Sequence, residues 1–202
     1  MDMTKWLRQL GESKKPLPLL SFPGIRFLKG VNVRQMVTDS ALQAACMKAV
    51  ADRVDAAAAV SFMDLSVEAE AFGAAIEFFD DDVPAVIGTL VCDEEESEAL
   101  AVPEVGAGRT GLYIDAIRLA KARITDRPVL AGAIGPFSLA GRLVDVSEAM
   151  YLCYDEPDMG GRELPFLIRG DQTGQRLRQH HAVGACITQG PDVGDGEPDA
   201  FL

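Results

Sequence analysis

Apolar residues recur along the chain with two different periods. Over residues 32–53 and again over 110–124 they repeat every three to four positions, which predicts amphipathic helices. Each of these helices is followed by a run that is apolar at almost every position, "AAAAVSFM" (56–63) and "RPVLAGAIG" (127–135). Strands of continuous apolar character are typical of a parallel sheet that is covered by helices. The pattern therefore predicts an α/β fold.

Shorter elements are predicted between and around these segments. Residues 2–12 favour a short helix, and "SVEAEAFG" favours a helix that ends at Gly73, because glycine readily adopts the left-handed C-cap conformation. "AAIEFF" and "PAVIG" are strand candidates bounded by Asp and Pro residues. "DEEESEAL" predicts a helix with acidic residues at its positive end, and "GPFSLAGRLV" predicts a loop and a helix.

Two α/β architectures fit this order of elements, the doubly wound sheet and the (β/α)8 barrel. In both, functional groups gather where the parallel strands end. Asp64 stands directly after the first apolar strand, and a Gly-Pro turn ends the second. We therefore expect substrate-binding groups in these two places. The residues of the second place are Gly135, Pro136, Phe137 and Ser138.

The composition is that of a folded domain with an acidic surface. Of the 202 residues, 48% are hydrophobic, which suffices for a sizeable core. The formal net charge of -12 opposes binding to nucleic acids and to anionic membrane surfaces. The 4 cysteines have no CxxC spacing, and the N-terminal segment is polar. These features predict a reducing, cytoplasmic setting with no membrane span.

Several motifs taken together resemble the uroporphyrinogen decarboxylase superfamily. They are "SFPGIRFLKG", "FMDLSVEAEAFGAAIEF", "DDVPAV", "RPVLAGAIGPFSLAGRLV" and "YDEP", and they occur in family order over roughly residues 1–158. The closest likeness is to the methyltransferase branch, which methylcobalamin:coenzyme M methyltransferases typify. The resemblance implies a (β/α)8 barrel of the TIM type.

The decarboxylases of this superfamily provide one set of expected site residues. Asp64 falls where their aspartate holds the pyrrole nitrogens of a tetrapyrrole. Their arginine-rich segment, which grips propionate side chains, falls on "FPGIR", where Arg26 matches but Phe22 stands in place of the first arginine. Their tyrosine would fall near Arg142. Phenylalanine cannot replace a bidentate anion clamp, so porphyrinogen decarboxylation is the alternative reading.

The methyltransferase branch implies a different chemistry. In that branch a zinc ion binds the acceptor thiol and lowers its pKa, and a methylated corrinoid, free or on a corrinoid protein, supplies the methyl group. The resemblance therefore predicts a corrinoid-dependent methyltransferase whose acceptor is a small thiol such as coenzyme M.

Asp64 and Glu68 are the candidate catalytic residues. They lie four positions apart and share one face if a helix begins at once. Two close carboxylates push one pKa upward, which suits an acid/base pair. The alternative is that Asp64 is an N-cap, with Glu68 and Glu70 as one inward and one solvated helix residue. Arg26 either binds an anionic substrate group or pairs with the acidic surface.

The chain changes character after residue 158. Residues 159–202 show no sustained period, and their Gly, Pro and Gln content rises. We expect residues 1–158 to form an incomplete N-terminal portion of the barrel and the tail to be atypical, frameshifted or poorly ordered. A complete barrel takes about 250 residues, and the branch's zinc ligands lie in its carboxyl-terminal half. A third hypothesis is thus an inactive fragment, or one part of a split assembly, that self-associates through open sheet edges.

Two further motifs are interpreted as structural. His180, His181 and Cys186 do not have the His-x-Cys spacing of the branch, and adjacent strand residues point to opposite faces, so we expect no metal there. "GAGRTG" (106–111) matches G-x-G-x-x-G, but a proline interrupts the apolar run before it. We expect it to be the loop that begins the 110–124 helix.

Overall fold

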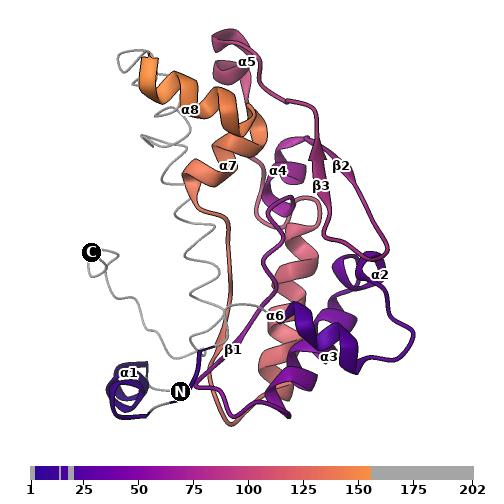
Figure 1. Cartoon of the computed structure of the whole chain (residues 1–202), viewed down its shortest axis with the longest axis vertical. Coiled ribbons are helices and arrows are strands. Elements are labelled where there is room, and N and C mark those ends of the chain that lie inside the picture. Colours follow the sequence, from indigo (N-terminus) through magenta and orange to yellow (C-terminus); the bar gives the residue numbers. More distant parts are fainter. Residues whose placement is uncertain (1–2, 14, 18–20, 156–202) are drawn as a thin grey trace.

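The computed structural model of the chain describes residues 3–13, 15–17 and 21–155. Two extended segments run lengthwise through the middle of the molecule beside helix α6, and α5, α7 and α8 gather at the end opposite α3 (Figure 1). None of the helices in these residues is long and apolar enough to cross a lipid bilayer. The helices are α1 (Met3–Glu12), the 3-10 helix η1 (Phe22–Phe27), α2 (Val33–Val37), α3 (Ser40–Ala51), α4 (Val67–Phe72), α5 (Glu94–Ala99), α6 (Thr110–Arg123), α7 (Pro136–Leu143) and α8 (Val146–Asp155).

The two continuous apolar runs form a parallel pair of strands. These are β1 (Ala59–Val60) and β4 (Val129–Leu130), with Ala59 opposite Val129. The pairing confirms the prediction of parallel strands, although the regular ladder is much shorter than the apolar runs. Most of the first run is buried, and so are Val129 and Ile134 of the second, which fits the small number of polar residues in both runs.

The helix predicted over residues 32–53 is two helices, α2 and α3. The break falls at Thr38 and Asp39, and the Asp39 carboxylate accepts hydrogen bonds from the backbone N–H of Ala41 at 2.7 Å and of Leu42 at 3.0 Å. An aspartate that caps a new helix in this way satisfies its first N–H groups. The prediction of one helix was wrong because the apolar period continues across this cap.

The main hydrophobic core lies between α3, α6 and the parallel strands. α3 and α6 make the most extensive contact between any two elements of the described residues, and they lie side by side in Figure 1. Phe62, just after β1, is fully buried in this core and meets Phe22 of η1 edge to face, with ring centroids 4.9 Å apart. Other buried members of the cluster are Met36, Met47, Ile117 and Val129.

The other two strands form a hairpin that is separate from the parallel pair. β2 (Ala75–Glu77) and β3 (Ala85–Ile87) are antiparallel, with Ile76 opposite Val86. The prediction of strands here is confirmed, and the two strands pair with each other. The connection, residues 78–84, is shorter than the roughly dozen residues that a parallel crossover needs. The hairpin follows Gly73, which ends α4 with φ 107° as predicted.

Helices α1 and α8 each contact a neighbouring part of the fold. The indole Nε1 of Trp6 donates a hydrogen bond to the backbone oxygen of Ala57 at 3.0 Å, which joins α1 to the segment before β1. α8 was not predicted; it begins after Asp145, which has φ 78°, and α8 packs on α7. A second apolar cluster lies there, with Ala69, Ile134, Leu139, Leu143 and Ala149 among its buried residues.

Substituting Gly24 tests the packing of η1 on α3. A Cβ at this position would lie 2.6 Å from Cys46 Sγ and 2.7 Å from Val50 Cγ2, so Gly24→Ala should destabilise the protein by about 1–3 kcal/mol. Urea denaturation measures the change. Gly11→Ala in α1, where no atom lies within 4 Å, is the matched control and should be neutral or stabilising by up to about 1 kcal/mol. Equal losses in both variants would contradict the close approach.

The thiols of Cys46 and Cys92 should differ sharply in reactivity. Cys46 is buried and burial raises the pKa of its thiol to about 12, whereas Cys92 is exposed. The thiolate is the nucleophile, and a raised pKa keeps Cys46 protonated at every pH below that value. At pH 8, iodoacetamide should modify Cys92 in the folded protein and Cys46 only after unfolding in urea. Peptide mass mapping checks this, and early labelling of Cys46 would show that the core is open.

Candidate functional site

A pocket of about 210 Å³ lies at the carboxyl ends of β1 and β4. Its walls are residues 62–64 after β1, residues 131–134 after β4, residues 102, 103 and 105 before α6, and residues of α4, α6 and α7. Most of the wall is apolar, with Phe62, Phe72 and Ile114 among its side chains. The pocket therefore brings together parts of the chain that are far apart in sequence, at the edge of the strands where α/β proteins bind ligands.

Asp64 lies at this edge, but its carboxylate is turned into the protein. The side chain is 0% exposed. One oxygen, Oδ1, accepts hydrogen bonds from the backbone N–H of Ser66 at 3.0 Å and from its hydroxyl at 2.6 Å. The other, Oδ2, accepts from Arg109 Nη1 at 2.6 Å and from the Tyr113 hydroxyl at 3.2 Å. These contacts engage both oxygens, so the part of Asp64 that lines the pocket is its backbone.

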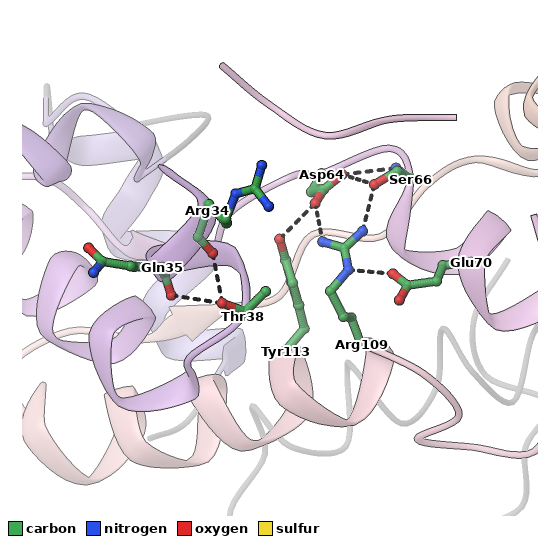
Figure 2. Close-up of polar contacts among 8 residues, drawn as sticks. All are labelled: Arg34, Gln35, Thr38, Asp64, Ser66, Glu70, Arg109 and Tyr113. Atoms are coloured by element: carbon green, nitrogen blue, oxygen red, sulfur yellow. Dashed lines mark hydrogen bonds and ion pairs between the residues drawn. The ribbon is translucent and has the colours of Figure 1, made fainter. Parts of the chain in front are cut away.

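Arg109 is the centre of this polar cluster. Figure 2 shows its guanidinium between Asp64, Ser66 and Glu70, with the Tyr113 hydroxyl beside it. Nη2 donates to the Ser66 hydroxyl at 2.7 Å, Nε pairs with Glu70, and the guanidinium lies 4.8 Å from the centroid of the Phe78 ring. Burial by itself lowers the pKa of Arg109, but the hydrogen bonds and charges of Asp64 and Glu70 outweigh it and raise the pKa above its ordinary value.

The turn that carries Arg109 is the "GAGRTG" segment. Gly106 has φ 89° and Gly108 has φ 54°, conformations that glycine adopts without strain. A Cβ at Gly111 would lie 2.8 Å from the backbone oxygen of Gly106, so the turn is tight. Arg109 is the N-cap residue of α6, as expected of a loop that begins this helix. The glycines thus allow α6 to start where its arginine reaches Asp64.

Tyr113 supplies a hydroxyl that stays protonated. Burial raises the pKa of this hydroxyl well above its ordinary value, and the neighbouring Asp64 carboxylate raises it further. A tyrosine in this state is a hydrogen-bond donor to Asp64 and not a base. Tyr113 also lines the pocket, so its ring forms part of the ligand-facing wall.

Glu68 occupies a different part of the wall. It is half-buried in α4 and lines the pocket, and its Oε1 accepts a hydrogen bond from the backbone N–H of Ile134 at 3.1 Å. This contact joins α4 to the segment after β4. In the candidate acid/base pair, Asp64 is bound by Arg109, and Glu68 contacts the backbone of Ile134.

The other expected substrate-binding residues are distributed around the site. Pro136 lines the pocket at the start of α7, and Gly135 is the N-cap of that helix. Phe137 and Ser138 are exposed and are not among the described residues that line the pocket. The same is true of Arg26, which is exposed in η1. Their roles stay predictions.

No metal site is found among the residues that the structure describes, since no three His, Cys, Asp or Glu side chains lie together there. His180, His181 and Cys186, for which we expected no metal, lie outside the described residues.

Sequence reasoning missed Arg109 and Tyr113. A signal was available for Arg109, because a cation at the positive end of a helix is unfavourable unless an anion holds it. Tyr113 lies within the apolar period of residues 110–124, yet a buried tyrosine hydroxyl needs a polar partner. Both residues contact Asp64, which is 45 and 49 positions away, and no local pattern connects them.

A pocket built where parallel strands end, and walled by the helices that follow them, defines an α/β protein of the barrel-related kind. Residues 25–187 match the family model described as uroporphyrinogen decarboxylase (URO-D), and the chain belongs to this family. The motif-based prediction of the family is confirmed.

Two relatives carry the word methyltransferase in their names. Methylcobamide:CoM methyltransferase MtbA of Methanosarcina acetivorans is 37% identical over 79 residues, which are 38% of this chain and 23% of that protein. A solved structure, a methyltransferase from Methanosarcina mazei, aligns with a TM-score of 0.64 at 22% identity over 77% of this chain and 48% of that chain. This chain therefore spans less than half the length of either relative. The structural likeness confirms the α/β barrel-type fold; how much of a barrel the chain forms stays a prediction.

Removing the cation of the buried cluster should be costly. Arg109→Met leaves Asp64 charged and buried without its partner, which should destabilise the protein by about 3–5 kcal/mol. Arg118→Met is the matched control, because Arg118 lies on the same helix and its pair with Asp115 is exposed on both sides. Its loss should be about 1 kcal/mol or less. Urea denaturation compares the two variants, and equal losses would show that the buried cluster adds no stability of its own.

Proposed function

We propose that the protein takes part in methyl transfer from a methylated corrinoid to a small thiol. The support is membership of the URO-D family together with the likeness to MtbA, a protein named for methyl transfer between a cobamide and CoM. The match covers 23% of MtbA. Methyl transfer by this chain is therefore a proposal.

The observation that carries this proposal is the withdrawn carboxylate of Asp64. A decarboxylase of the family would use the corresponding aspartate to hold pyrrole N–H groups. Here both oxygens of Asp64 are bound by Ser66, Arg109 and Tyr113, and the side chain is 0% exposed. Arg26, the candidate anchor for a propionate, is exposed outside the pocket wall. Porphyrinogen decarboxylation is therefore the weaker candidate.

The size and lining of the pocket favour a small ligand. Sites for drug-sized molecules usually measure about 300–1,000 Å³, whereas this pocket measures about 210 Å³. A thiol of a few heavy atoms suits that volume better than a tetrapyrrole. Apolar side chains such as Phe62 and Phe72 would exclude water from the bound thiol, which favours a reactive sulfur nucleophile.

The residues of the pocket would position the acceptor thiol. The bonds that form and break belong to the thiol and to the methylated corrinoid. The thiolate sulfur attacks the methyl carbon, an S–C bond forms, and the cobalt–carbon bond breaks with its electron pair remaining on cobalt. Asp64 is assigned a positioning role, because it fixes Arg109, Tyr113 and the start of α4. The described residues provide no set of ligands for zinc, so no step of this proposal uses that metal.

The proposed partners are a corrinoid, free or on a carrier protein, and a small thiol in the cytoplasm. Self-association through open sheet edges also stays a proposal. The hairpin favours it, because Ile87 of β3 is 53% exposed and Val83 before it is 45% exposed. An inactive fragment, or one part of a split assembly, is the competing proposal, and it differs from the first in predicting no turnover by the chain alone.

Anaerobic incubation with methylcob(III)alamin and 2-mercaptoethanol tests the proposed reaction. The chain should consume methylcobalamin and form the S-methyl thioether, followed by absorbance and by mass spectrometry. Ala133→Leu, which extends a side chain into the pocket, should lower the rate at least about tenfold. Ala122→Leu, on the exposed side of α6, should leave it unchanged. If no thioether forms above the protein-free blank, the proposal of methyl transfer by this chain fails.

A further inference from the structure

Ser61 is the one polar residue of the apolar run "AAAAVSFM" (56–63). It is 4% exposed and lies directly after Val60, the last residue of β1 to pair with β4. A buried hydroxyl is costly unless its oxygen or its proton takes part in hydrogen bonds. The partners of the Ser61 hydroxyl therefore indicate what this residue does in the fold.

The backbone ladder between the two strands shows where the next hydrogen bond would fall. The N–H of Ala59 donates to the Pro128 oxygen at 2.9 Å, and the N–H of Ser61 donates to the Leu130 oxygen at 2.9 Å. The bonds of a parallel pair are evenly spaced along the strands. In this register the next donor is the N–H of Gly132, and its acceptor in a continued ladder would be the backbone oxygen of Ser61.

Gly132 bonds to the serine side chain instead. Its N–H donates to Ser61 Oγ at 2.8 Å, and the Ser61 hydroxyl donates in turn to the backbone oxygen of Phe62 at 3.1 Å. The side chain thus takes the place of a direct backbone contact between the two runs. Beyond Ser61, no backbone–backbone hydrogen bond joins these two parts of the described structure.

The pocket begins where the ladder ends. Residues 62–64 and 131–134, which follow this point on the two strands, form two of its walls. Hydrogen-bonded strands lie about 4.8 Å apart, a spacing that leaves no room for a ligand between them. A ladder that continued past Ser61 would therefore draw these two walls together.

We infer that the Ser61 hydroxyl is a spacer that ends the pairing of β1 with β4 and so keeps the pocket open. The inference rests on the proposed function only in taking the ligand to be a thiol. Ser61 is not among the described residues that line the pocket, but Phe62 and Gly132, which it bonds, both are. Ser61 is therefore a positioning residue, which acts on the ligand through its two neighbours.

Ser61→Ala tests the spacer directly. Without the hydroxyl, the N–H of Gly132 should bond to the backbone oxygen of position 61, and a crystal structure of the variant should place these two atoms within about 3.2 Å. Calorimetry on the full chain should show 2-mercaptoethanol bound at least about tenfold more weakly than by the unaltered protein. In the methyl-transfer assay, KM for this thiol should rise by a similar factor while kcat stays within about threefold.

Two further variants separate the spacer from a general loss of stability. Ser21→Ala removes another buried hydroxyl, which donates to the Val60 oxygen, and neither residue is among the described ones that line the pocket. Its affinity for 2-mercaptoethanol should stay within about twofold of that of the unaltered protein. Ser61→Thr keeps the hydroxyl, so its affinity should stay within about threefold.

One measurement needs no variant at all. In the unaltered protein the amide of Gly132 should exchange slowly with deuterium, because Ser61 Oγ binds it although the backbone ladder has ended. Exchange of this amide at the rate of a solvated loop would overturn the inference.

The remaining outcomes separate the inference from the proposed reaction. Unchanged binding by Ser61→Ala, or equal losses in Ser61→Ala and Ser21→Ala, overturns the inference and leaves methyl transfer standing. Weaker binding by Ser61→Ala without thioether formation by the unaltered protein supports the inference while the reaction fails. If the unaltered protein binds no 2-mercaptoethanol, the crystal structure decides. A direct backbone bond in Ser61→Ala supports the spacer, and a water in place of the hydroxyl overturns it.

Discussion

One buried guanidinium holds the site together. Arg109 joins the segment after β1, helix α4 and the start of α6 through Asp64, Ser66 and Glu70. Each of these charges would be costly to bury alone, and together they are tolerable because every one has an oppositely charged or hydrogen-bonded partner. The cluster therefore forms as a unit. It fixes the angle at which α4 leaves the strand, and so it sets the position of the pocket wall.

The shape of the pocket depends on that cluster and on the contact between Glu68 and the backbone of Ile134. Glu68 reaches from α4 to the backbone of Ile134 after β4, so α4 is tied both to α6 and to the second strand. The strands themselves pair over only Ala59–Val60 and Val129–Leu130. Side-chain contacts such as those of Glu68 and Arg109 therefore hold α4 and the strands in place, where a longer β-ladder would otherwise do so. The same arrangement turns the Asp64 carboxylate into the cluster, whereas Glu68 lines the pocket wall.

Local signals predicted most of the fold. The apolar period located α6, the glycine at position 73 located the end of α4, and the continuous apolar runs located the parallel strands. The break at Asp39 was missed because the apolar period runs through it, and the strand signals of the hairpin did not show how its strands pair. The polar cluster lay beyond sequence reasoning for another reason. Its contacts between residues 64–70 and residues 109–113 join positions that are 39 to 49 apart in sequence, and the packing of α6 brings them together.

The indole of Trp6 gives the protein a built-in optical reporter. Trp6 is the single tryptophan of the chain, and its Nε1 is bonded to Ala57 just before β1. Tryptophan emission moves to longer wavelength as water reaches the ring. The emission maximum therefore reports whether α1 is packed against the segment before β1. Detachment of the N-terminal helix can thus be followed without attaching a dye, and separately from loss of the core.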